Sequence, residues 1–128
     1  MSQLSPRVKV ALAGINGYGN TYLNYVLDRG EDRGVELVGI IDPTASRNER
    51  LPELKSAGIL IVDSLDAFYA KATADLVVIS APIQHHLPMS RTAVNNGSNV
   101  LCEKPLAATG EEAKAFYELE KNASTFIA

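Results

Sequence analysis

The stretch Val8–Asp42 reads VKVALAGINGYGNTYLNYVLDRGEDRGVELVGIID, and the order of its apolar and glycine-rich segments determines the fold. The first apolar run is of strand length and nearly unbroken, which is typical of a parallel strand buried on both faces. In chain order, the segments are a strand at Val8–Ala13, a loop at Gly14–Gly19, a helix at Tyr22–Leu27, a strand at Val35–Ile41 and the acid Asp42.

The glycine loop has the features of a phosphate-binding turn. A turn that leaves a strand and begins a helix points free backbone N–H groups and the positive end of the helix dipole at one spot. Gly14 permits the sharp turn, while Gly17 and Gly19 allow close approach of a ligand and close packing of helix on strand. Asp42, at the carboxyl end of the next strand, can accept hydrogen bonds from both ribose hydroxyls of an adenosine. The stretch therefore predicts dinucleotide binding; the alternative is a structural strand–helix–strand turn in which Asp42 only caps the turn that follows it.

Two residues of the loop, Asn16 and Tyr18, are not glycines and carry large side chains. Asn16 occupies the position that usually carries the second glycine of the G-x-G-x-x-G pattern. Asn tolerates a left-handed backbone better than most residues, so we expect the loop to accommodate it. Tyr18 has two alternatives, since it would either cover the pyrophosphate or pack at the surface.

Composition places the chain in a broad class. Its 128 residues suffice for one domain, and 46% hydrophobic with 21% charged residues is typical of a soluble globular protein. The net charge of −3 and the lack of a basic patch argue against nucleic acid or an anionic membrane as a partner. The apolar runs are too short to span a bilayer, and residues 1–6 do not resemble a signal peptide, so we expect a cytoplasmic protein. The single cysteine excludes an internal disulfide, and the only histidines, His85 and His86, are adjacent and would not share a helix face, so we assign no metal site.

Apolar runs continue to alternate with helical patterns after Asp42. We predict further strands at 59–62, 76–79, 99–102 and 125–127, and helices at 48–57, 64–69, 86–96 and 110–121. Such alternation implies right-handed crossovers and a doubly wound parallel sheet. The predicted fold class is therefore α/β, a Rossmann fold with three α/β/α layers, and residues 1–128 form a single domain.

A charged pair, Glu103-Lys104, comes directly after the predicted strand at 99–102 and is followed by Pro105. Taken alone, it would be a solvated loop with a local ion pair. However, the carboxyl ends of parallel strands meet at one edge of the sheet, so Lys104 would project into the cleft where a nicotinamide lies. A lysine there can hydrogen-bond a substrate hydroxyl and assist proton removal as hydride leaves the same carbon. Glu103 would hold the lysine or contact the cofactor. Pro82, after the fourth strand, would shape the floor of the cleft or merely end the strand.

These motifs resemble those of the Gfo/Idh/MocA oxidoreductases (glucose–fructose oxidoreductase, inositol dehydrogenase and their relatives). The resemblance rests on Gly14–Gly19, Ser80–His86 and Gly97–Leu106, with Glu-Lys-Pro as its most specific part, and it extends from Val8 to the end of the chain. It implies an NAD(P)-dependent dehydrogenase or reductase that acts on a sugar, a cyclitol or a related polyol.

The resemblance also implies roles for single residues. Lys104 corresponds to the active-site lysine, Asp42 to the ribose-binding acid, and His86 to a histidine usual after the fourth strand. One of His85 and His86 would approach the nicotinamide, or else serve only as a polar residue where the helix begins. The catalytic residue is thus Lys104, and the cofactor-binding residues are Gly14, Asn16, Gly17, Tyr18, Gly19, Asp42, Ala81, Pro82, His86, Glu103 and Lys104.

The expected cofactor is NAD, because the charge of Asp42 would repel the 2′-phosphate of NADP. Arg47 lies close enough in sequence to offset that repulsion, so NADP is the alternative.

Chains of this family continue into a second α/β domain that supplies the substrate pocket and a catalytic histidine, and through which relatives usually form homo-oligomers. This chain stops at Ala128, where that domain would begin, so we expect it to bind the cofactor without turning over a sugar or polyol substrate. One alternative is a dinucleotide-sensing or regulatory module that performs no chemistry. Another is a reductase of a different Rossmann family with a G-x-x-G-x-x-G loop, in which Asn20 would replace the last glycine.

Overall fold

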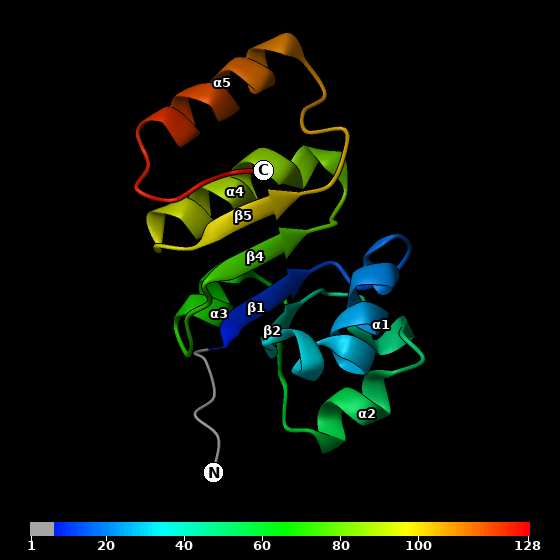
Figure 1. Cartoon of the computed structure of the whole chain (residues 1–128). Helices are drawn as coiled ribbons and strands as arrows, with labels where there is room; N and C mark the ends of the chain where they lie inside the picture. The colour runs from blue at the N-terminus through cyan, green and yellow to red at the C-terminus, as the bar shows by residue number, and fades with distance from the viewer. Residues whose placement is uncertain (1–6) are drawn as a thin grey trace.

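The computed structural model describes residues 7–128, so residues 1–6, on which the signal-peptide prediction rests, lie outside it. The described chain contains one sheet of five parallel strands in the order β3-β2-β1-β4-β5. This order and direction confirm the predicted Rossmann fold. Figure 1 shows β1, β4 and β5 side by side. The strands are β1 (Val8–Ala13), β2 (Val35–Ile41), β3 (Leu60–Val62), β4 (Leu76–Ile79) and β5 (Asn99–Cys102).

The helices follow the predicted order, with differences at their ends. They are α1 (Gly19–Arg29), α2 (Leu51–Ser56), α3 (Leu65–Tyr69), α4 (His86–Asn95) and α5 (Gly110–Lys121), with short 3-10 turns at Glu31–Arg33, Ala45–Arg47 and Ile83–His85. The helix predicted at 48–57 is shorter because Asn48 Oδ1 accepts a hydrogen bond from the Arg50 amide at 2.9 Å, which holds the chain in a turn before α2 begins.

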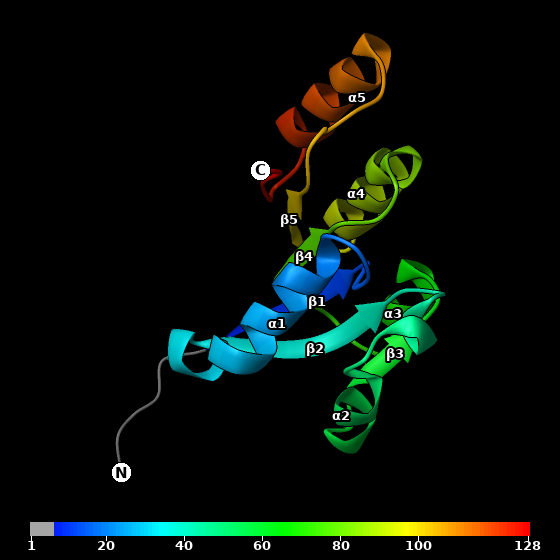
Figure 2. The same ribbon diagram turned by 90° about the vertical axis from the view of Figure 1, so that its right-hand side faces the viewer.

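Helices cover both faces of the sheet, which confirms the three predicted layers (Figure 2). Leu23 of α1 and Leu54 of α2 pack on one face, and Phe68 of α3 and Ala93 of α4 pack on the other. Alternate residues of β1 supply both cores, since successive side chains of a strand point to opposite faces. Gly39 in β2 makes room for Phe68, because a Cβ atom there would lie 2.5 Å from its ring.

The sixth strand predicted at 125–127 is wrong as a strand of the sheet. Ile127 forms a single parallel bridge to Val100 of β5, with backbone bonds from the Val100 amide to Phe126 O at 2.9 Å and from the Ala128 amide to Val100 O at 2.8 Å. The pairing is parallel, as the prediction requires, but one bridge is too short to count as a strand. α5, which precedes this segment, lies beside α4 and beyond β5 (Figure 1).

Among residues 7–128, no helix is both long enough and apolar enough to cross a membrane.

Candidate functional site

A cavity of about 730 Å³ lies at the carboxyl edge of the sheet, where the loops after β1, β2, β3 and β4 meet. This position includes the point between β1 and β4 at which the strand order reverses, which is where open α/β sheets bind ligands. Seven of the predicted cofactor residues line it, namely Gly14, Asn16, Gly17, Tyr18, Asp42, Ala81 and Pro82.

The three glycines of the loop take the positions expected of a phosphate-binding turn. Gly14 has φ +93°, and a Cβ atom there would lie 2.9 Å from the Ser80 backbone, so the loop packs directly on the end of β4. Gly17 has φ +60° and would meet nothing within 4 Å, which leaves the cavity side of the loop open. A Cβ atom on Gly19 would lie 2.2 Å from the Gly14 carbonyl oxygen, so α1 can begin this close to β1 only at a glycine.

Asp42 is buried in the cavity wall, with 8% of its surface exposed. Its Oδ2 accepts a hydrogen bond from the Ile15 amide at 2.9 Å, and its Oδ1 accepts from the amide and the hydroxyl of Thr44, both at 2.7 Å. The carboxylate therefore does cap the following turn, as one alternative held. A carboxylate offers about four acceptor sites, so these three bonds leave Asp42 room for about one more, from a single ribose hydroxyl.

Asn16 does not use the left-handed backbone that we expected to accommodate it, since every residue with positive φ in the described chain is a glycine. Its side chain binds the neighbouring loop instead. Nδ2 donates to the Thr44 carbonyl at 2.8 Å and to the Thr44 hydroxyl at 3.0 Å, and Oδ1 accepts from Asn48 Nδ2 at 3.2 Å. Asn48 Nδ2 also contacts the Ile15 carbonyl at 2.9 Å and Asn20 Oδ1 at 3.1 Å. An amide thus joins the glycine loop to the loop after β2, where a glycine could not.

Tyr18 is 64% exposed and its ring lies edge-on to Tyr22, with 6.1 Å between the centroids. It lies at the protein surface and lines the cavity, so its contact with a pyrophosphate stays a prediction.

Several cavity residues were not assigned from the sequence. The loop that joins β3 to α3 and the first turn of α3 contribute two each, and α4 contributes Pro88, Met89 and Thr92. The sequence offered one indication that these residues belong to the site, namely that they follow the carboxyl end of a strand. Ser64 and Asp66 also fit a helix cap, however. Ser64 Oγ does accept a hydrogen bond from the Ala67 amide at 3.1 Å. The residues in the wall without an assignment are Ile41, Pro43, Thr44, Asp63, Ser64, Leu65, Asp66, Ser80, Pro88, Met89 and Thr92.

The Glu-Lys-Pro segment follows β5 at the same edge of the sheet but lies outside the cavity wall. Lys104 is exposed, and its peptide bond to Pro105 is cis. Glu103 accepts a hydrogen bond from the Tyr22 hydroxyl of α1, which holds the pKa of the carboxyl below its usual value, and the same bond together with burial raises the pKa of Tyr22 to about 12. Glu103 Oε1 also accepts from the Lys104 amide at 3.2 Å. Tyr22 is thus a residue of the site region that the sequence did not reveal.

The two histidines lie in different surroundings. His85 is exposed and lines the cavity. His86 is 3% exposed and sits outside the cavity wall, with Nε2 2.9 Å from the Ala81 carbonyl oxygen and Nδ1 3.2 Å from that of Leu106. Contact between His86 and a cofactor stays a prediction, and His85 is the histidine nearer to the cavity space.

No group of three or more His, Cys, Asp or Glu side chains within residues 7–128 is arranged to hold a metal ion. Cys102 is half-buried, and burial raises the pKa of its thiol to about 11, which keeps it protonated and unreactive near neutral pH.

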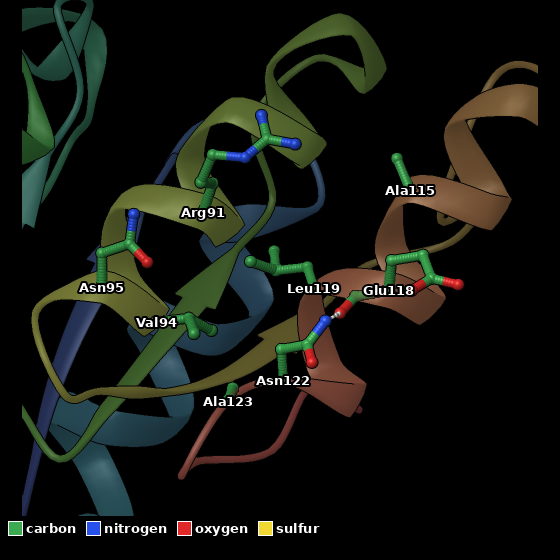
Figure 3. A pocket seen from close by; sticks show the side chains of 8 residues that line it. All are labelled: Arg91, Val94, Asn95, Ala115, Glu118, Leu119, Asn122 and Ala123. Carbon is green, nitrogen blue, oxygen red and sulfur yellow. Dashed lines mark hydrogen bonds between the residues drawn. The ribbon is translucent and has the colours of Figure 1, made fainter.

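Two smaller hollows lie elsewhere. One of about 350 Å³ runs between α4 and α5 and contains none of the predicted site residues (Figure 3). Another of about 300 Å³ lies on the other side of the glycine loop, and Asn16, Gly17 and Arg47 are among its lining residues.

Residues 8–128 match the family model described as "Oxidoreductase family, NAD-binding Rossmann fold". The chain belongs to the Gfo/Idh/MocA family. The match spans the glycine loop, Asp42 and the Glu-Lys-Pro segment together. This NAD-binding domain is what the sequence motifs predicted.

Curated relatives and solved structures agree with this membership. The chain is 30% identical over 118 residues to inositol 2-dehydrogenase of Corynebacterium glutamicum (strain R), covering 92% of this chain and 34% of the relative. It is 26% identical over 125 residues to D-glucoside 3-dehydrogenase of Escherichia coli, covering 97% of this chain and 34% of the relative. The structure of GenD2 from gentamicin A biosynthesis in complex with NAD superposes with a TM-score of 0.78 at 26% identity, over 99% of this chain and 35% of that one. The chain spans about a third of the length of the curated relatives that it matches.

The described residues fit a nicotinamide dinucleotide. Gly17 leaves open space where a diphosphate would approach the backbone, and the N-terminus of α1 lies immediately beyond it. The carboxylate of Asp42 stands in the same cavity wall, and the volume of about 730 Å³ is of the size that small-molecule and cofactor sites have.

Proposed function

We propose that this chain is the cofactor-binding domain of an NAD-dependent oxidoreductase that transfers hydride from a sugar, a cyclitol or a related polyol. One observation carries the proposal: a single cavity at the strand reversal is bounded by the glycine loop, by Asp42 and by the Ala81-Pro82 turn, in a chain of the Gfo/Idh/MocA family. The curated relatives with stated activities include an inositol dehydrogenase and a glucoside dehydrogenase, which supports the substrate class.

Each part of the cavity would hold a different part of the cofactor. The amides of the glycine loop and the N-terminus of α1 bind the pyrophosphate, because they present donors and a positive partial charge. Asp42 accepts a hydrogen bond from the adenosine ribose. Ala81 and Pro82, at the end of β4, face the nicotinamide half, where bound NAD accepts the hydride.

Lys104 is the residue to which we give the chemistry. Its side-chain amine would accept the proton of the substrate hydroxyl while the carbon that carries this hydroxyl gives its hydride to the cofactor. Glu103 keeps the lysine segment attached to α1 through Tyr22. The pocket that recognises the sugar or polyol would come from residues outside this chain, because the relatives are about three times as long.

A second candidate, an NAD-binding sensor without chemistry, is favoured by one observation: Lys104 is exposed and does not line the cavity. Lys104→Ala separates the two when dehydrogenase turnover and NAD⁺ binding are both measured. The catalytic role requires turnover to be lost while NAD affinity stays nearly unchanged. Binding of NAD⁺ without any turnover in the unaltered protein would favour the sensor, and unchanged turnover in Lys104→Ala would reject Lys104 as the catalytic residue.

Cofactor binding can be tested on the 128-residue chain by titration calorimetry with NAD⁺ and NADP⁺. We expect NAD⁺ to bind more tightly, and Asp42→Ala to weaken it, while Asp32→Ala, a matched change in the exposed turn Glu31–Arg33, leaves it unchanged. Tighter binding of NADP⁺ would show that Arg47, beside the glycine loop, outweighs Asp42. No binding of either cofactor would reject the proposal.

A further inference from the structure

Side chains from opposite helical layers lie within hydrogen-bond distance of both ends of the segment Glu103–Leu106. At one end, the Tyr22 hydroxyl of α1 donates to Glu103 Oε2. At the other end, His86 of α4 lies with Nδ1 3.2 Å from the Leu106 carbonyl oxygen. α1 and α4 cover different faces of the sheet, so the segment that crosses the carboxyl edge is anchored from both sides.

Tyr22 connects this segment to the helix that begins at the glycine loop. The tyrosine is half-buried, and its ring contacts Tyr18 of that loop. Glu103 is fixed further by its own backbone, since its amide donates to the Ile79 carbonyl of β4 at 2.9 Å. The bond between Tyr22 and Glu103 therefore sets the position of the residue that directly precedes Lys104 relative to the pyrophosphate-binding turn.

His86 connects the segment to the turn after β4. Its other ring nitrogen, Nε2, lies 2.9 Å from the carbonyl oxygen of Ala81, which lines the cavity. Both neighbours are acceptors, so a neutral ring donates to one of them and a protonated ring donates to both. With 3% of its surface exposed, the ring has little water to bind instead.

Lys104 has no side-chain hydrogen bond or ion pair of its own among residues 7–128, so its neighbours must order it. We propose that Tyr22 and His86 are positioning residues that hold Lys104 at the nicotinamide side of the cavity. This inference rests on the proposed role of Lys104. Neither residue touches the reacting atoms; each acts by fixing one end of the segment.

The test begins with Tyr22→Phe, which removes only the hydroxyl. The control is Tyr25→Phe, the same change on an exposed tyrosine of the same helix. In the free chain, the ¹⁵N heteronuclear NOE of Lys104 reports its backbone order without any cofactor. We expect it to fall in Tyr22→Phe and to stay unchanged in Tyr25→Phe.

The second measurement uses the NAD⁺-saturated chain. We expect the NOE between the Lys104 ε-methylene and the nicotinamide ring to lose more than half of its intensity in Tyr22→Phe, while the NAD⁺ affinity changes less than threefold. Unchanged values of both NOEs in Tyr22→Phe would overturn the inference. If NAD⁺ fails to bind even to the unaltered chain, the proposed function fails, whereas the free-chain measurement still decides whether the segment is anchored.

Conservative variants distinguish positioning from general stability. Glu103→Gln keeps an acceptor for Tyr22 and should retain the order of Lys104, whereas Glu103→Ala should lose it. His86→Gln keeps an N–H donor and should retain the order of the segment better than His86→Leu, which keeps only the bulk. If the glutamine variants lose as much order in the segment as Glu103→Ala and His86→Leu do, hydrogen bonding does not position the segment.

Discussion

The backbone amide of Ile15 donates to Asp42 Oδ2 across 2.9 Å, and this bond joins the glycine loop to the end of β2. The same carboxylate caps the turn at Thr44 through Oδ1. Asp42 therefore shapes the wall of the cavity before any ligand arrives, and its proposed bond to a ribose would use a carboxylate that the protein already holds in place.

Replacing Asp42 should affect both stability and binding. In Asp42→Ala, the buried Ile15 amide loses its acceptor, so we expect the free energy of unfolding in urea to fall by about 1–3 kcal/mol. We also expect the dissociation constant for NAD⁺ to rise at least about tenfold, which corresponds to about 1.4 kcal/mol. Loss of stability with unchanged NAD⁺ affinity would show that Asp42 caps the turn and does not bind the cofactor.

A methyl group at Gly19 should destabilise the protein strongly. The Cβ atom of Gly19→Ala would lie 2.2 Å from the Gly14 carbonyl oxygen, so α1 must move away from the glycine loop. We expect a loss of about 1–3 kcal/mol, as for overpacked cores, together with weaker NAD⁺ binding. Gly110→Ala is the matched control, because nothing lies within 4 Å of its Cβ position and the change should be neutral or stabilising by up to about 1 kcal/mol. Equal effects of the two changes in thermal unfolding would contradict this account.

Changing Asn16 to glycine restores the usual motif but should not improve the protein. Asn16→Gly removes two donated bonds to Thr44 and one accepted from Asn48, and it adds freedom to the unfolded chain. We expect the unfolding free energy to fall by about 1–3 kcal/mol, measured in urea. A variant as stable as the natural sequence would show that these bonds contribute little.

The bond between Tyr22 and Glu103 should make stability depend on acidity. The hydrogen bond from Tyr22 is the main cause that lowers the pKa of Glu103 in the folded chain. The stabilisation of the fold by this bond is therefore fully present above pH 4.5, the ordinary pKa of the carboxyl, and is lost as the pH falls through the lower pKa of the folded chain. The natural protein should therefore exceed Tyr22→Phe in melting temperature at about pH 7, and the difference should shrink at about pH 3. The melting temperature of Tyr25→Phe should differ from that of the natural protein by the same amount at both pH values. If the difference for Tyr22→Phe is also the same at both pH values, the hydrogen bond from Tyr22 is not the cause of the lowered pKa of Glu103.

Strand positions and the order of the elements were predictable because they follow from local patterns. The runs Leu76–Ile79 and Asn99–Cys102 are strands at the predicted residues. Gly14 and Gly19 could be assigned for the same reason, since a sharp turn and a close contact require a missing side chain wherever the motif occurs. The end of the chain was less predictable, because Thr125–Ile127 has strand-like residues but forms only one bridge.

The local sequence therefore sufficed to predict the parallel sheet and the glycine turn. It also sufficed to predict that Gly14, Asp42 and Pro82 meet at one edge of the sheet, because parallel strands have their carboxyl ends at the same edge. Side-chain partners depended on packing in three dimensions. Tyr22 and Glu103 are 81 residues apart, and nothing in either segment indicates the other. Whether His85 or His86 faces the cavity follows from the direction in which α4 starts, and that direction is set by the core against which the helix packs.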